Sequence, residues 1–101
     1  MQADDRELVE IFLSKNVYKS TQDKINSYVL KHIIQKYIRI YMTDEEMQKI
    51  LLDNGFNNAG GESWFCGKVK PEILIKYYGS TYRKRATIKQ VTSKYMIVRE
   101  R

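Results

Sequence analysis

The sequence predicts an α+β fold, in which residues 1–101 form one small domain. Apolar residues recur with the helical period in three stretches between residues 3 and 54, whereas residues 63–69 alternate as in a strand. The segment 86–99 is rich in Val, Ile, Thr and Tyr, which are typical of strands. A hydrophobic content of 43% is too high for a disordered chain, so these patterns belong to a folded core.

The first helix is expected over residues 3–15. Acidic residues stand at its start, where the helix dipole favours carboxylates. Leu8, Ile11 and Phe12 have the spacing of one helical face. We therefore expect these three side chains to be buried.

The second helix is expected over residues 20–41. Ser20 and Asp23 have the spacing of a capping box at a helix start. Two adjacent apolar stripes follow, and the second of them contains Leu30 and Ile34. A helix this apolar is expected to run through the centre of the domain, with neighbours on both sides.

The third helix is expected over residues 44–54, because Thr43 and Glu46 form a capping box. Gly55 supplies the left-handed residue that ends such a helix, and Phe56 supplies the apolar contact that follows it. Asp44 and Glu45 add negative charge to the helix start. This helix is therefore a poor candidate for reading DNA.

A short strand and a short helix are expected next. Within residues 63–69, Phe65, Gly67 and Val69 lie on one face, and Trp64, Cys66 and Lys68 on the other. Pro71 suits the first position of a helix over 71–78, which Gly79 ends.

The C-terminal segment is expected to form a β-hairpin, with strands near 86–91 and 95–99. Thr92, Ser93 and Lys94 supply the turn. A terminal helix is the alternative, since Ile88, Val91 and Tyr95 also fit a helical period. A basic hairpin after helices is compatible with a winged-helix arrangement.

The positive charge is concentrated in the second part of the chain. Residues 61–101 contain ten basic and three acidic side chains, whereas residues 1–60 contain eight basic and nine acidic ones. A large, localised charge produces a field that attracts polyanions. The sequence therefore favours a nucleic acid as partner, and double-stranded DNA more than RNA.

The candidate interface combines cations with tyrosines around the predicted hairpin. Arginine and lysine neutralise phosphates and release counterions, and hydroxyl groups add further contacts. Three lysines around the 71–78 helix are expected near the same surface, where the helix N-terminus favours phosphate. The predicted nucleic-acid-binding residues are Lys68, Lys70, Lys76, Tyr82, Arg83, Lys84, Arg85, Lys89 and Lys94.

An alternative hypothesis is a protein-binding function. The chain would then be a small adaptor or inhibitor that binds an acidic protein, or a homo-oligomeric interaction module. The doubled apolar stripe of the 20–41 helix would provide a homodimer interface, with Leu30 and Ile34 in contact across it.

Catalysis and cofactor binding have no support in the sequence. One histidine, His32, and one cysteine, Cys66, supply neither a metal-ligand set nor a disulfide. No secretory signal and no apolar run of about 18 residues is present, so a cytoplasmic protein without a membrane contact is expected.

Residues 51–56, Leu-Leu-Asp-Asn-Gly-Phe, resemble the end of the leucine-rich helix in the HicA-type toxins. In that family a Gly-Ser-His strand follows, and the histidine supports ribonuclease activity. Here residues 61–64 are Gly-Glu-Ser-Trp. The resemblance therefore predicts no ribonuclease activity for this chain.

Overall fold

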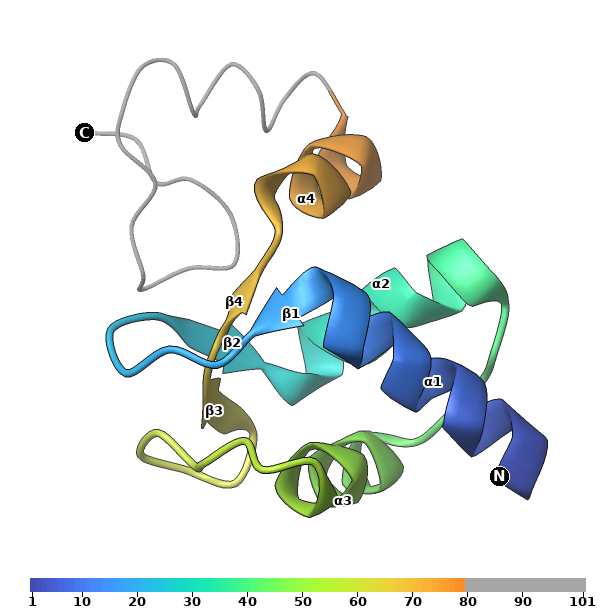
Figure 1. The fold of residues 1–101 in the computed structure, drawn as a ribbon, viewed down its shortest axis with the longest axis horizontal. Coiled ribbons are helices and arrows are strands. Elements are labelled where there is room, and N and C mark those ends of the chain that lie inside the picture. The colour runs from blue at the N-terminus through green and yellow to red at the C-terminus, as the bar shows by residue number, and fades with distance from the viewer. Residues whose placement is uncertain (80–101) are drawn as a thin grey trace.

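A computed structural model describes residues 1–79, which fold into four helices and two small antiparallel sheets (Figure 1). The predicted hairpin over 86–99 lies outside the described residues. The α+β class is confirmed in this part of the chain. The elements are α1 (Ala3–Asn16), β1 (Val17–Tyr18), β2 (Lys24–Asn26), α2 (Ser27–Ile38), α3 (Asp44–Asp53), β3 (Trp64–Cys66), β4 (Lys68–Val69) and α4 (Pro71–Tyr78).

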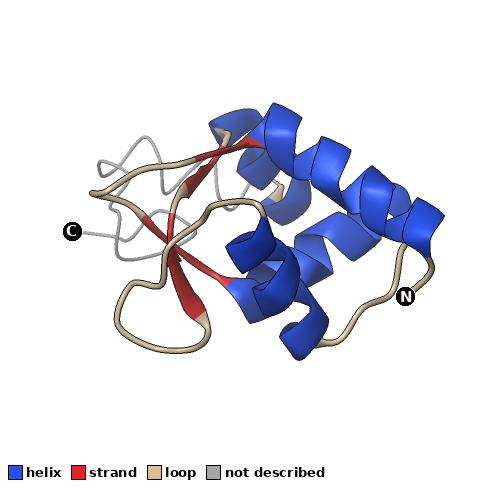
Figure 2. Cartoon of the chain, turned by 60° about the horizontal axis from the view of Figure 1, so that its bottom comes forward, coloured by secondary structure: helices blue, strands red, loops and turns tan. Residues whose placement is uncertain are grey.

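The strands gather at one end of the molecule, and α1, α2 and α3 pack together at the other (Figure 2). Two strands, β1 and β2, separate α1 from α2, so the N-terminal part is not the simple run of helices that the sequence predicts.

Helix α2 begins at Ser27, seven residues later than expected. The Asn26 side chain caps it, because Asn26 Oδ1 accepts hydrogen bonds from the Tyr28 and Val29 amides at 2.9 and 3.2 Å. Ser20 and Asp23 instead form a local turn, in which the Asp23 amide donates to Ser20 Oγ at 3.1 Å. The prediction that Ser20 and Asp23 cap the start of this helix was therefore wrong.

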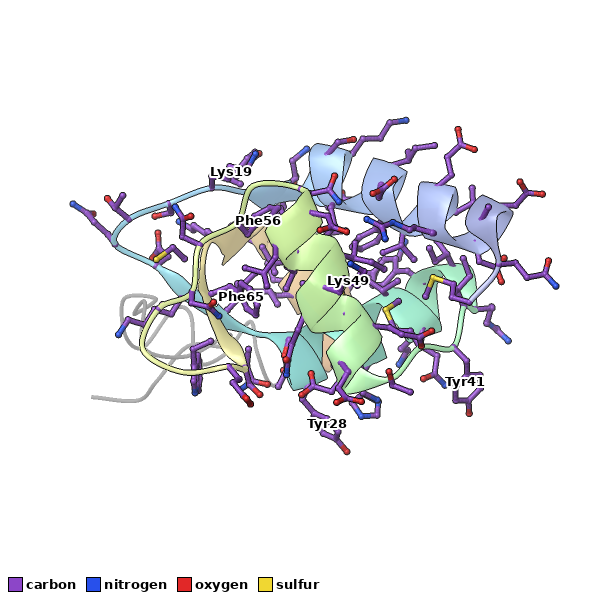
Figure 3. The ribbon with its side chains drawn as sticks, turned by 90° about the horizontal axis from the view of Figure 1, so that it is seen from below. Lys19, Tyr28, Tyr41, Lys49, Phe56 and Phe65 are labelled. Carbon is purple, nitrogen blue, oxygen red and sulfur yellow. The ribbon has the colours of Figure 1, made fainter. Side chains whose placement is uncertain are left out.

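Helix α2 also ends earlier than predicted, at Ile38 instead of Tyr41. Arg39 adopts the left-handed conformation, with φ of 60°, and its amide still donates to Gln35 O. Tyr41 lies beyond this cap and is 79% exposed, and Figure 3 shows its side chain pointing away from the molecule. The stripe that included Tyr41 therefore does not continue into the core.

The buried face of α1 differs from the expected one. Val9, Phe12 and Leu13 are buried, whereas Leu8 and Ile11 are 51% and 42% exposed. Both sets have helical spacing, so periodicity alone could not distinguish them. Val17 continues the Val9–Leu13 row and pairs with Val69, which orients this row toward the core.

Helices α3 and α4 lie where the sequence predicts them. The Thr43 hydroxyl accepts from the Glu46 amide at 3.1 Å, and Glu46 Oε1 accepts from the Thr43 amide at 2.8 Å. The expected capping box is thereby confirmed. Gly55 has φ of +87°, and buried Phe56 follows it and donates its amide to Leu51 O.

The predicted strand over 63–69 is divided at Gly67 into β3 and β4. Its alternation is confirmed, because Phe65, Gly67 and Val69 are buried and Lys68 is exposed. A Cβ at Gly67 would lie 3.1 Å from the backbone oxygen of Tyr18, so a larger residue has no room there. Strand β3 pairs with β2 and strand β4 pairs with β1.

The core lies where the strands meet α1, α2 and α3. Phe65 and Ile25, which face each other across β2 and β3, are almost fully buried beside Leu30, Met47 and Leu51. Figure 3 shows Phe56 and Phe65 on the inner side of α3. This packing holds the two short sheets against the helices.

A polar cluster joins the starts of α2 and α3. Asp44 accepts hydrogen bonds from the Ser27 and Ser63 hydroxyls and from the Gln48 amide, at 2.5, 3.3 and 2.9 Å. Ser27 is fully buried, so this bond satisfies its hydroxyl. The acidic start of α3 is therefore a structural contact.

Candidate nucleic-acid interface

The outer side of the two sheets carries cations and the aromatic side chains of Tyr18 and Trp64, and we call the basic part of this surface around Tyr18 the strand face. It consists of Tyr18, Lys24, Cys66 and Lys68, together with Lys70, which follows β4. Tyr18 lies opposite Lys68, and Lys24 lies opposite Cys66. Since paired residues project to the same side of an antiparallel sheet, their side chains are neighbours.

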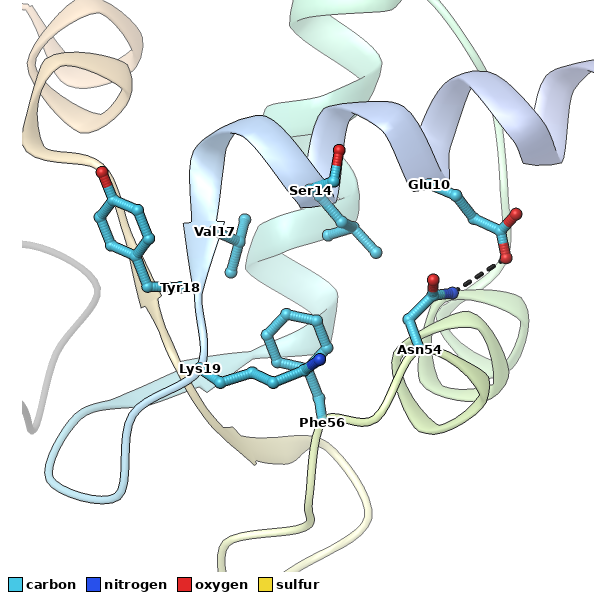
Figure 4. A pocket seen from close by; sticks show the side chains of 8 residues that line it. Glu10, Ser14, Val17, Tyr18, Lys19, Asn54 and Phe56 are labelled. Carbon is cyan, nitrogen blue, oxygen red and sulfur yellow. Dashed lines mark hydrogen bonds between the residues drawn. The ribbon is translucent and has the colours of Figure 1, made fainter.

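Tyr18 lies at the centre of the strand face. Its side chain is 50% exposed, and Lys70 Nζ lies 5.9 Å from the centre of its ring. Figure 4 shows the Tyr18 ring beside the segment that leads to α4, on the other side of β1 from Phe56. Its strand neighbour Val17 is 5% exposed. Val17 therefore supplies the packing of β1, and the Tyr18 ring remains accessible.

The lysines of the strand face lack acidic partners within residues 1–79. The ion pairs found there connect Met1 with Glu46, Arg6 with Glu10 and Asp53, and Lys49 with Asp53. None of them involves a lysine of the strand face. The positive charge of this surface is thus available to an external anion.

Lys76 lies at a different place, where α4 meets α2. Its Nζ is 5.9 Å from the ring centre of Tyr37, and Lys36 Nζ is 5.5 Å from that of Tyr77. The Tyr37 hydroxyl donates to Ile73 O at 3.0 Å, and burial raises the pKa of this hydroxyl. Tyr37 therefore remains protonated at neutral pH, and its hydrogen bond to Ile73 O connects α2 with α4.

The N-terminus of α4 is a weaker phosphate site than the sequence indicates. Pro71 has no amide hydrogen, and the Ile73 and Leu74 amides both donate to Lys70 O at 3.0 and 3.3 Å. Among the first four residues of α4, only Glu72 keeps an amide N–H that could bind an anion. Glu72 also carries a carboxylate, which repels a phosphate. Phosphate binding here would therefore depend on the lysines.

Charge is unevenly distributed over the described elements. Residues 1–79 contain eleven basic and eleven acidic side chains, so the whole net charge of +6 comes from residues 80–101. Eight of those eleven acidic side chains lie on α1 and α3, which carry only three basic ones. The remaining described segments are consequently basic, and the strand face belongs to them.

The predicted site residues divide into two groups. Tyr82, Arg83, Lys84, Arg85, Lys89 and Lys94 lie outside the described residues. The structure places Lys68 and Lys70 together beside Tyr18, and Lys76 beside Tyr37.

Sequence reasoning missed Tyr18 and Lys24. The two strands that carry them are two and three residues long, too short for a recognisable alternation. Their partners stand more than forty positions later in the chain, so no local pattern reveals the pairing.

A hollow of about 510 Å³ lies beside β1, and both Val17 and Tyr18 contribute to its lining. Leu13, Val17 and Phe56 form its apolar part, and Lys19 Nζ lies 5.3 Å from the Phe56 ring centre (Figure 4). Glu10 at its edge already accepts a hydrogen bond from Asn54 at 2.9 Å. Among the residues that line the hollow, Lys19 is therefore a cation with no acidic partner within residues 1–79, and it lies above the apolar part of the hollow.

Metal-binding geometry does not occur in the described part of the chain, because no three His, Cys, Asp or Glu side chains converge there. His32 is half-buried and contacts the exposed Tyr28 ring edge to face, with ring centres 4.6 Å apart. No helix within residues 1–79 is long and apolar enough to cross a membrane.

Comparison of the chain with protein-family models, with curated proteins and with solved structures gave no match.

Proposed function

We propose that this protein is a non-catalytic nucleic-acid-binding protein that contacts the phosphates of double-stranded DNA. The observation that carries the proposal is the distribution of charge. Seven basic side chains and one acidic one fall within residues 80–101, and the described lysines beside Tyr18 have no acidic partners within residues 1–79. Such a distribution favours a polyanion over a small ligand.

Arg83, Lys84 and Arg85 are assigned the main phosphate contacts, with Lys89 and Lys94 extending them. Lys68, Lys70 and Lys76 add positive charge on the described part of the chain. Because phosphate contacts carry no base information, this binding is expected to depend weakly on sequence.

The acidic α1 and α3 support an oriented approach. Negative charge on these helices repels a polyanion, while the strand face and α4 attract it. The α3 N-terminus is occupied by its own capping box and by the Asp44 cluster. Asp44, Glu45 and Glu46 also place three carboxylates in its first turn, which disfavours a phosphate there.

The test is a titration of a labelled duplex at low salt, with a variant in which Arg83, Lys84 and Arg85 are all changed to Ala. Loss of three phosphate contacts should weaken binding and reduce the slope of log K against log salt by about 3. The matched control changes Lys15, Lys31 and Lys49 to Ala, because these cations lie on α1, α2 and α3 and belong neither to the strand face nor to α4. If both variants bind like the wild type, the assignment is wrong.

A further inference from the structure

The Tyr18 ring is half exposed and does not belong to the buried core. Its neighbour Val17 makes the buried contact of β1 with Val69, whereas the ring lies on the strand face and is half exposed. An exposed tyrosine ring offers a flat, apolar surface with a polar hydroxyl at its end, and it suits a flat partner that can stack on it.

The surroundings of the ring select the chemistry of that partner. Lys68 lies directly across the sheet and Lys70 Nζ lies 5.9 Å from the ring centre, so a bound group must be anionic close to the ring. Lys24 lies in the second sheet, opposite Cys66, and adds positive charge to the same strand end of the molecule. A nucleotide satisfies both conditions, because its base is flat and its phosphate is negative.

The nucleotide must be unpaired. In a duplex the faces of each base are covered by the neighbouring bases, and only the edges are accessible from the grooves. Proteins that bind single strands combine a basic surface with aromatic rings on which bases stack. The strand face has this combination.

We infer that the strand face binds single-stranded nucleic acid, with an unpaired base stacked on Tyr18 and the flanking phosphates held by Lys68 and Lys70. This inference rests on the proposed nucleic-acid-binding function and extends it to a second class of strand. It assigns duplex phosphates to the cations of residues 80–101 and unpaired bases to the strand face.

The test compares labelled single strands and duplexes of about 16 nucleotides, a length that covers the usual site sizes. Tyr18→Leu should weaken single-strand binding by about 5- to 100-fold, the range expected for one lost base stack, and leave duplex binding within about 2-fold. Tyr18→Phe should keep the affinity, since the ring is retained.

Tyr28→Leu is the matched control. Tyr28 is 55% exposed and has Lys31 Nζ 4.7 Å from its ring centre, but it lies on α2, away from the strand face. Figure 3 shows it projecting from the edge of the molecule. This variant should bind single strands like the wild type.

The outcomes distinguish a failure of this inference from a failure of the proposed function. If the wild type binds duplex but not single strands, or if Tyr18→Leu behaves like Tyr28→Leu, the inference is wrong and the proposed function stands. If the wild type binds neither strand form at low salt, both fail. Because Tyr18 is half exposed, the thermal unfolding of its variants should match that of the wild type, which checks that they are folded.

Discussion

Val17 and Tyr18 illustrate how two adjacent residues acquire different roles. Side chains alternate across a strand, so Val17 enters the core and Tyr18 faces outward. Gly67 lies against the backbone of Tyr18 and keeps this pair in place. The position of the Tyr18 ring thus depends on the small size of a buried residue in the opposite strand segment.

Gly67→Ala should destabilise the protein by roughly 1–3 kcal/mol, because the new methyl group would meet the Tyr18 oxygen at 3.1 Å and the Ile25 and Phe56 side chains at 3.3 Å. Urea unfolding measures this change. Gly61→Ala is the control, since its methyl group would lie at an ordinary 3.7 Å from Trp64. Equal stability of the two variants would contradict the packing described at Gly67.

Arg6 links α1 to the end of α3 through two carboxylates. Its side chain contacts Asp53 at 2.8 Å and Glu10 at 3.2 Å. The pKa of Glu10 is lowered by hydrogen bonds from Asn54 and Arg6, and the pKa of Asp53 is lowered by the hydrogen bond from Arg6. Both carboxylates are therefore more acidic in the folded chain than in the unfolded one.

A lowered pKa in the folded state adds stability above the unfolded pKa, and this contribution disappears as the pH falls through the folded value. The free energy of unfolding should thus be steady near neutral pH and decrease below about pH 4.5. The Arg6→Met variant should have a smaller free energy of unfolding than the wild type at neutral pH. On acidification, this free energy should decrease by less than it does in the wild type. Denaturant unfolding at several pH values tests this.

Lys49→Met provides the comparison for that experiment. Lys49 also approaches Asp53, but at 3.7 Å and with 72% of its side chain exposed. Its pH profile should follow the wild type closely. A profile for Arg6→Met that runs parallel to the wild type would contradict the role given to Arg6.

At the scale of elements, local signals predicted α3 and α4 well. The capping box at Thr43 and the Pro71 start each act within a few residues, so the sequence carries them directly. The start of α2 was wrong because two similar caps, at Ser20 and at Asn26, compete. Pairing of Ile25 with Phe65 decides between them, and that contact spans forty residues.

The candidate site was also predicted only where local sequence signals sufficed. Lys68 and Lys70 were predicted from local charge, whereas Tyr18 depends on a strand pairing that no local pattern reveals. The division of the 63–69 segment at Gly67 likewise follows from its close approach to Tyr18.

Leu30 and Ile34, the two α2 residues considered for a homodimer interface, do not lie on an exposed face of the helix. Leu30 and Ile34 are both fully buried among the residues of their own chain. Leu30→Ala should therefore cost about 2–5 kcal/mol of folding stability. Unfolding curves for this variant and for the wild type, recorded at several protein concentrations, should be independent of concentration. A concentration-dependent midpoint would instead indicate an obligate oligomer.

On the scale of the whole molecule, the described part combines acidic α1 and α3 with a basic strand end and carries no net charge of its own. The charge that drives association is therefore assigned to residues 80–101. We expect a polyanion to be drawn to the side away from α1 and α3, where the strand face lies with lysines that have no acidic partner within residues 1–79.

The most direct test of this account is the affinity of the full chain for a labelled duplex, measured over a range of salt concentrations. Contacts between cations and phosphates predict a straight line of log K against log salt, with a negative slope of about 0.9 per phosphate neutralised. We expect a slope of several units. Absence of duplex binding at low salt, or an affinity that does not change with salt, would contradict the proposed function.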